Sequence, residues 1–224
     1  MEFAKTISRW PTAFDPERGR DVAARFGAGG ALRDLIAGAA GSSPYLHDLL
    51  CQETEWLPGA LEDPRAALAA LLSDPAPDAM RRDKRRMALL VALHDLGGLW
   101  SLEEVTGALS DFADRAVDLA LSADCAPLQA RGLLPENPGL YALAMGKLGA
   151  RELNYSSDID LILLMDDEGL GETESMERRR HLVRAARGAM KRLSDVTAGG
   201  YVFRTALRLR PDAAVTPIVV SPRF

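Results

Sequence analysis

The sequence predicts an α+β protein, with an N-terminal helical bundle over residues 1–130 and a small sheet with helices over residues 131–224. Three observations support this class. The first part is rich in Ala and Leu at helical spacing. The chain is then broken by prolines at Pro135 and Pro138. After the break come short apolar runs bounded by turn residues, which are typical of strands.

The helical part divides into several predicted helices. Three Ala/Leu-rich pieces are expected at residues 31–39, 44–55 and 64–72, and a longer helix at residues 78–96. The clearest helix begins at Ser101. This serine and Glu104, three residues later, have the spacing of a capping box, in which each side chain accepts a hydrogen bond from a free backbone N–H.

The second part alternates strand and helix signals. Residues 140–145 and 159–165 are predicted strands, because they are too short for independent helices. An acidic, glycine-containing loop is expected at residues 166–175, followed by a helix at residues 177–195 and a strand at residues 201–209.

Composition narrows the function classes. The net charge is −5, which argues against a protein that binds nucleic acid through a basic surface. No apolar run approaches the roughly 20 residues that span a bilayer, and the N-terminus lacks the apolar segment of a signal peptide. A cytoplasmic location is therefore the expectation. The two cysteines are predicted to be small buried or half-buried thiols, and with three scattered histidines they do not make a zinc site.

Two carboxylates mark the start of the second predicted strand. Asp158 and Asp160 lie two positions apart, so in a strand they project from the same side. Two anions so close are tolerated when a cation lies between them, and oxygen ligands alone favour Mg²⁺ or Mn²⁺. The alternative is a pair of strand-end acids that points into solvent.

Phosphate-binding groups precede this acidic pair. A glycine-rich turn lets backbone N–H groups approach phosphate oxygens, and hydroxyls and a lysine add donors. Phosphate donors beside a two-carboxylate metal site are typical of phosphoryl or nucleotidyl transfer. The candidate phosphate-binding residues here are Gly146, Lys147, Gly149, Ser156 and Ser157.

These motifs resemble a known signature. The runs at residues 146–149, 151–154 and 156–160 are similar to those of the bifunctional glutamine synthetase adenylyltransferase/adenylyl-removing enzymes, of the DNA polymerase β-like nucleotidyltransferase superfamily. Residues 202–211 look like the second motif of that family. The resemblance implies a polymerase β-like catalytic core over residues 131–224, and Arg208 and Arg210 facing the substrate phosphates.

The resemblance also implies an activity and partners. Family enzymes carry two nucleotidyltransferase units: one removes AMP from a tyrosine of glutamine synthetase by phosphorolysis, giving ADP, and the other attaches AMP from ATP. A helical region before a single motif resembles the N-terminal, removing half. Because the sequence stops at Phe224, soon after the second motif, the resemblance implies a fragment or truncated product. The implied partners are adenylylated glutamine synthetase, ADP or ATP, phosphate and a PII-type signalling protein. The alternatives are the adenylylating direction and a non-catalytic module that binds a nucleotide or a partner.

One expected carboxylate is missing. Polymerase β-like enzymes hold two metal ions with three carboxylates, and the resemblance places the third at Ala206. Strand alternation puts Arg204, Ala206, Arg208 and Arg210 on one face, where a small apolar residue has no evident packing role. The hypothesis is that Ala206 replaces an aspartate and impairs the activity.

Overall fold

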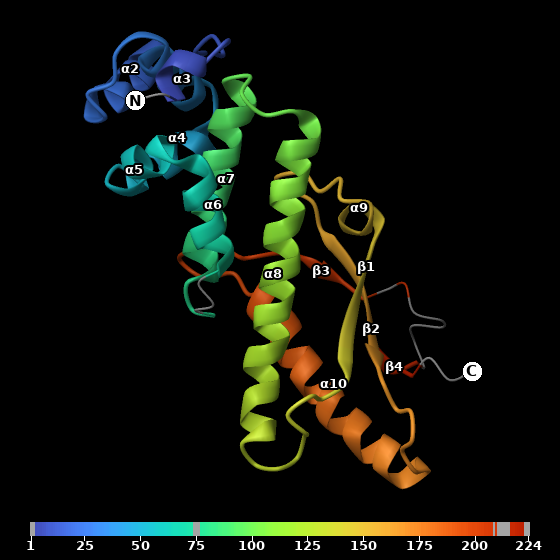
Figure 1. The fold of residues 1–224 in the computed structure, drawn as a ribbon. Coiled ribbons are helices and arrows are strands. Elements are labelled where there is room, and N and C mark those ends of the chain that lie inside the picture. The colour runs from blue at the N-terminus through green and yellow to red at the C-terminus, as the bar shows by residue number, and fades with distance from the viewer. Residues whose placement is uncertain (1–2, 74–76, 208, 210–215, 222–224) are drawn as a thin grey trace. The chain divides into compact units, whose positions relative to one another are not determined.

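A helical region is followed by a small mixed sheet with helices, so the predicted α+β class is confirmed (Figure 1). The computed structural model describes residues 3–73, 77–207, 209 and 216–221. The chain forms two compact units. One comprises Met1–Asp74 with Arg82–Phe112, and the other Pro75–Arg81 with Ala113–Phe224. The division into domains at residue 130 stays a prediction.

The first unit is helical. Its core is built from aliphatic side chains that are almost fully buried, including Leu35, Ile36, Leu50 and Leu57. Two long helices, α7 and α8, contribute residues to both units. The helices are α1 (Phe3–Thr6), α2 (Pro16–Arg25), α3 (Gly30–Ser42), α4 (Pro44–Gln52), α5 (Trp56–Glu62), α6 (Pro64–Ser73), α7 (Met80–Leu96) and α8 (Leu102–Gln129).

Local sequence signals explain where several helices begin. The predicted capping box is confirmed: the Ser101 N–H donates to Glu104 Oε2 at 2.9 Å, and the Glu104 N–H donates to Ser101 Oγ at 3.2 Å. Asp15 caps α2 and Ser43 caps α4, each followed by a proline in the first turn. The predictions did not include α1, α2 and α5. Of these, α1 and α5 are short, with four and seven residues, whereas α2 has a capping aspartate that was not recognised.

The second unit is built on a four-stranded sheet. Strand β1 (Leu140–Met145) is antiparallel to β2 (Ile159–Met165), in a register that runs from Leu140 opposite Met165 to Met145 opposite Asp160. The short strands β3 (Thr205–Ala206) and β4 (Val219–Val220) pair in parallel with the other edge of β2. The predicted bounds of β1 and β2 are confirmed. Of the strand predicted at 201–209, only β3 forms among the described residues.

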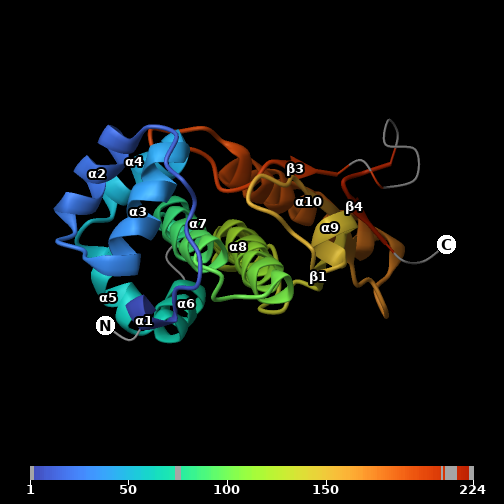
Figure 2. The same ribbon diagram turned by 90° about the horizontal axis from the view of Figure 1, so that it is seen from above.

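The two faces of the sheet differ. Along β2, Ile159, Leu161, Leu163 and Met165 are buried, while Asp160 and the other alternate residues are half-buried. Helix α10 (Glu172–Ser194) packs against the sheet, and its Arg192 Nε donates to Asp124 Oδ2 of α8 at 3.0 Å. Figures 1 and 2 show α10 on one side of the sheet. The more exposed face, which carries Asp160, is therefore the one where a ligand has access.

The start of α10 corrects one prediction. The helix begins at Glu172 rather than at residue 177, so the predicted loop at 166–175 is shortened at its C-terminal end. Ser175 Oγ donates to the buried Asp167 at 3.2 Å, which fixes the loop to the first turn. Glu172 and Glu174 are favourable in that turn because anions are stabilised by the positive end of the helix dipole.

The structure also tests the expectations for the two cysteines and for membrane-spanning segments. Cys125 is buried and Cys51 is half-buried, as predicted, and both are free thiols. Among the helices that the structure describes, none has the length and apolar character needed to cross a membrane.

Candidate functional site

Asp160 lies at the centre of the candidate site. Its neighbour across the antiparallel edge is Met145, and its neighbour across the parallel edge is Ala206. Because directly paired residues point to the same face, a carboxylate at position 206 would lie beside that of Asp160. The side chain is half-buried, and within the described residues it has no hydrogen-bond or ion-pair partner. An acid in this setting is available to bind a cation.

The predicted glycine turn is a single helical turn, α9 (Gly146–Gly149), which follows β1. Gly146 has φ +57°, a conformation that favours glycine, and a Cβ at this position would lie 3.0 Å from Asp160 Oδ2. A Cβ on Gly149 would lie 2.5 Å from the carbonyl oxygen of Ala144. The two glycines therefore let the backbone approach both the acid and β1. Their role in phosphate binding stays a prediction.

Asp158 precedes β2 and is more exposed than Asp160. Its side chain is 55% exposed and accepts a hydrogen bond from Arg204 Nε, which forms an ion pair. Arg204 Nη2 also donates to the carbonyl oxygen of Ser156 at 3.0 Å. The hydrogen bond to Asp158, with smaller contributions from Tyr201 and from the charge of Asp158, raises the pKa of the Arg204 guanidinium. Asp158 therefore already has a positively charged partner.

The other predicted phosphate donors lie around this pair. Ser157 Oγ donates to Asn154 Oδ1 at 2.7 Å, so its hydroxyl closes a local turn. Ser156 and Lys147 have exposed side chains. Ala206 lies in β3, directly opposite Asp160. Arg208 and Arg210 lie outside the described residues, so their predicted phosphate contacts are not described.

The next question is whether the side chains of the site can bind the expected Mg²⁺ or Mn²⁺ ion. In the described part of the chain, no group of three or more His, Cys, Asp or Glu side chains is arranged to hold a metal ion. The remaining donors, the carboxylate oxygens of Asp158 and Asp160, fit a hard cation such as Mg²⁺. A metal at Asp158 must share that carboxylate with Arg204.

Arg204 is the residue of this site to which the sequence reasoning assigned no function. It was placed on the same strand face as Ala206, but no partner was predicted for it. The alternation offered a signal: with Ala206 opposite Asp160, an arginine two positions earlier falls opposite Asp158, the residue before β2. The pairing between Arg204 and Asp158 spans 46 residues of sequence, which is why local spacing did not reveal it.

A small mixed sheet with aspartates at a strand start, beside a glycine-containing turn, fits the nucleotidyltransferase class that the sequence motifs predict. The model of the family "Glutamate-ammonia ligase adenylyltransferase" matches residues 32–223. The chain belongs to this family.

Relatives match over nearly the whole chain. The bifunctional glutamine synthetase adenylyltransferase/adenylyl-removing enzyme of a Bradyrhizobium species is 39% identical, over 96% of this chain and 24% of the relative. The protein of the same name from Rhodopseudomonas palustris is 40% identical, over 97% and 24%. That from Xanthobacter autotrophicus is 40% identical, over 84% and 21%. The chain thus spans about a quarter of the length of these relatives.

Proposed function

We propose that the chain is a nucleotidyltransferase domain that acts on glutamine synthetase in the control of nitrogen assimilation. The finer proposal is removal of AMP from an adenylylated tyrosine by phosphorolysis. The family membership supports the nucleotidyltransferase class, and the names of the relatives support glutamine synthetase as the partner. The net charge of −5 argues against a nucleic acid as the substrate.

The proposed reaction exchanges one bond to phosphorus for another. An oxygen of inorganic phosphate attacks the phosphorus of the AMP group, and the bond from that phosphorus to the tyrosine oxygen breaks. The tyrosine oxygen takes up a proton, and ADP is released. Asp158 and Asp160 would hold Mg²⁺ or Mn²⁺, which when bound neutralises charge on the phosphates. The backbone at Gly146 and the exposed Lys147 would orient the nucleotide phosphates beside Asp160.

The family match over residues 32–223 is the single observation that carries this proposal. The pairing of Asp160 with Ala206 determines how much activity we expect. Asp160 is half-buried and has no partner among the described residues, and the position next to it carries a methyl group where a third carboxylate would complete the proposed metal site. Without it, metal binding depends on Asp160 and on Asp158, which Arg204 already engages. We therefore expect the phosphorolytic activity of this chain to be low.

The same observations favour a second candidate, a non-catalytic module that binds a nucleotide or a partner protein. In that case the ion pair between Asp158 and Arg204 is the resting arrangement of the site, and turnover is absent. The adenylylating direction is a third outcome of the experiment below, because the same carboxylates serve both directions.

The decisive experiment is Ala206→Asp, with Ala206→Asn as a control of equal size and no charge. ADP formation from adenylylated glutamine synthetase and phosphate is measured with Mg²⁺ or Mn²⁺. We expect Ala206→Asp to raise the rate by about 10²-fold and Ala206→Asn to leave it unchanged. Equal rates in the chain and in Ala206→Asp would contradict a missing ligand at position 206.

Two further measurements separate the alternatives. Transfer of labelled AMP from ATP to unmodified glutamine synthetase by Ala206→Asp would indicate the adenylylating direction. If calorimetry finds no metal-dependent ADP binding by either variant while glutamine synthetase still binds, the non-catalytic module is supported.

A further inference from the structure

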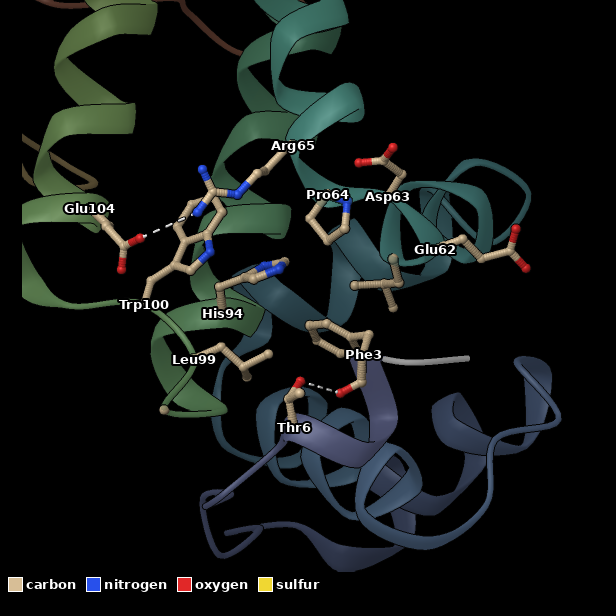
Figure 3. Close-up of a pocket in the computed structure, with 12 residues that line it drawn as sticks. Phe3, Thr6, Glu62, Asp63, Pro64, Arg65, His94, Leu99, Trp100 and Glu104 are labelled. Carbon is tan, nitrogen blue, oxygen red and sulfur yellow. Dashed lines mark hydrogen bonds and ion pairs between the residues drawn. The ribbon is translucent and has the colours of Figure 1, made fainter.

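The helical unit contains a cavity of about 530 Å³ that the proposed nucleotidyltransfer does not use. It lies between α1, the corner where α5 meets α6, the end of α7 and the start of α8. Its walls combine aromatic, acidic and aliphatic side chains (Figure 3). A cavity of this size is large enough for a small-molecule ligand, since such sites are typically about 300–1,000 Å³.

One wall is a stack of three aromatic rings. The His94 imidazole lies 4.3 Å from the Trp100 ring, at an interplanar angle of 33°. On its other side the Phe3 ring approaches edge-on, with the centroids 5.0 Å apart. Figure 3 shows the His94 ring directed toward the space between Phe3 and Pro64. Phe3 and His94 are almost fully buried and Trp100 is half-buried, so Trp100 is the ring against which a flat ligand can stack.

His94 supplies a hydrogen-bond acceptor within the wall. The residue is only 2% exposed, and Nδ1 lies 2.6 Å from the carbonyl oxygen of Leu90, an acceptor. Nδ1 therefore carries the proton, and burial lowers the pKa of His94, so the ring is neutral and Nε2 is an acceptor. Over the described residues, Nε2 has no hydrogen-bond partner. Nε2 is not among the fully buried unpaired polar atoms of the described residues, so it is open to a ligand N–H group that donates to it.

The rim of the cavity is acidic. Glu62, Asp63 and Glu104 oppose a single cation, Arg65. Arg65 offers little neutralisation, because its side chain is 89% exposed and its Nη2 lies 4.0 Å from Glu104. Asp63 caps α6 through the N–H of Ala66, whereas Glu62 has an exposed side chain with no partner in the described part of the chain. The net charge at the rim therefore favours a positively charged ligand.

We propose that this cavity binds a small molecule that has a flat aromatic ring, an N–H donor and one positive charge. The ring stacks on Trp100, the half-buried member of the aromatic wall. The N–H donates to His94 Nε2, and the positive charge lies near Glu62 and over the aromatic wall. Such a site gives the helical unit a ligand-binding role that is separate from the candidate nucleotide site.

Benzamidine is a suitable probe, because it combines a flat ring, N–H donors and a cation in a small molecule. Its binding to the full chain is followed by NMR through the indole N–H of Trp100, with Trp10 and Trp56 as internal controls. We expect a saturable shift of Trp100 alone, with a Kd of about 1 mM for a ligand of this size. Benzamide, which has nearly the same shape without the charge, should bind more weakly, and benzoate should not bind.

Variants test the individual contacts. His94→Phe keeps the stacked wall and removes the acceptor, and we expect benzamidine to bind about five- to tenfold more weakly. Glu62→Gln should weaken it by about two- to fivefold, while Glu17→Gln, an exposed acid of α2 outside the cavity, should have no effect. The absence of a saturable Trp100 shift in the native chain would overturn the proposal. So would equal binding of benzamide and benzamidine, or undiminished binding by a folded His94→Phe variant.

Discussion

The helical unit contains a largely buried arginine–carboxylate pair, whereas the candidate site of the sheet unit contains an exposed one. Two arginine–carboxylate pairs make the comparison. In the helical unit, Arg86 Nε lies 2.7 Å from Glu53 Oε2, with side chains only 25% and 6% exposed. In the sheet unit, both members of the Arg204–Asp158 pair are 55% exposed. The buried pair between Arg86 and Glu53 contributes to the stability of the fold. The exposed pair between Arg204 and Asp158 remains accessible to a ligand that competes for either side chain.

The largest stability effect is expected where a buried charge loses its partner. Arg86→Gln leaves the Glu53 carboxylate buried without a cation and removes the guanidinium from above the Trp56 ring. We expect the free energy of unfolding to fall by about 3 kcal/mol, measured by urea denaturation. Arg204→Gln is the matched change at the exposed pair and should alter the midpoint little. Equal losses in the two variants would remove the distinction between the two pairs.

The exposed pair between Arg204 and Asp158 also affects metal binding at Asp158. Arg204→Gln removes the cation that competes for Asp158, so Mn²⁺ binding should become tighter in this variant. Electron paramagnetic resonance of free Mn²⁺ measures the change. Weaker Mn²⁺ binding in a folded Arg204→Gln variant would argue that the arginine positions Asp158 for the metal instead.

An intermediate loss of stability is expected where the backbone of Gly149 in α9 lies close to the backbone of Ala144 in β1. Gly149→Ala places a Cβ 2.5 Å from the Ala144 carbonyl oxygen, so α9 must move away from β1. We expect a loss of about 1–3 kcal/mol in the free energy of unfolding, with a lower thermal midpoint. Gly171→Ala is the control, because a Cβ there meets no atom within 4 Å. A Gly149→Ala variant as stable as this control would show that α9 can shift freely.

The smallest expected effect is the contribution of His94 to the pH dependence of the unfolding free energy. Burial lowers the pKa of His94 in the folded state, so between the two pKa values the unfolded chain binds more protons than the folded one. The contribution to stability is complete above the unfolded pKa of about 6.5 and is lost as the pH falls below it. His94→Gln should reduce the slope of the unfolding free energy against pH. An unchanged slope would assign the pH dependence to other groups.

Local patterns predicted much of the fold because they act over a few residues. The strands at residues 140–145 and 159–165 have the predicted bounds, since short apolar runs between turn residues leave few alternatives. The Ser101–Glu104 capping box formed because both of its hydrogen bonds join residues three apart. The start of α10 was predicted too late because the loop contact of Ser175 with Asp167 has no local sequence signal.

The candidate site was predicted in part. Sequence spacing placed Asp160 and Ala206 on comparable faces of two strands, but spacing alone does not say that the strands are paired, or in which register. The roles of Arg208 and Arg210 stay predictions, since both lie outside the described residues. The cavity of the helical unit was not predicted, because Phe3, Leu61 and His94 are far apart in the sequence and none belongs to a motif.

The sequence by itself determined the α+β class, the two main strands and the signature that identifies the family, because each depends on residue types at short, fixed spacings. Only the tertiary structure decided that Arg204 engages Asp158, that Asp160 lies beside Ala206, and that His94 faces a cavity with an open acceptor. These contacts join residues tens of positions apart. They depend on how strands and helices pack, which the local pattern of the chain does not specify.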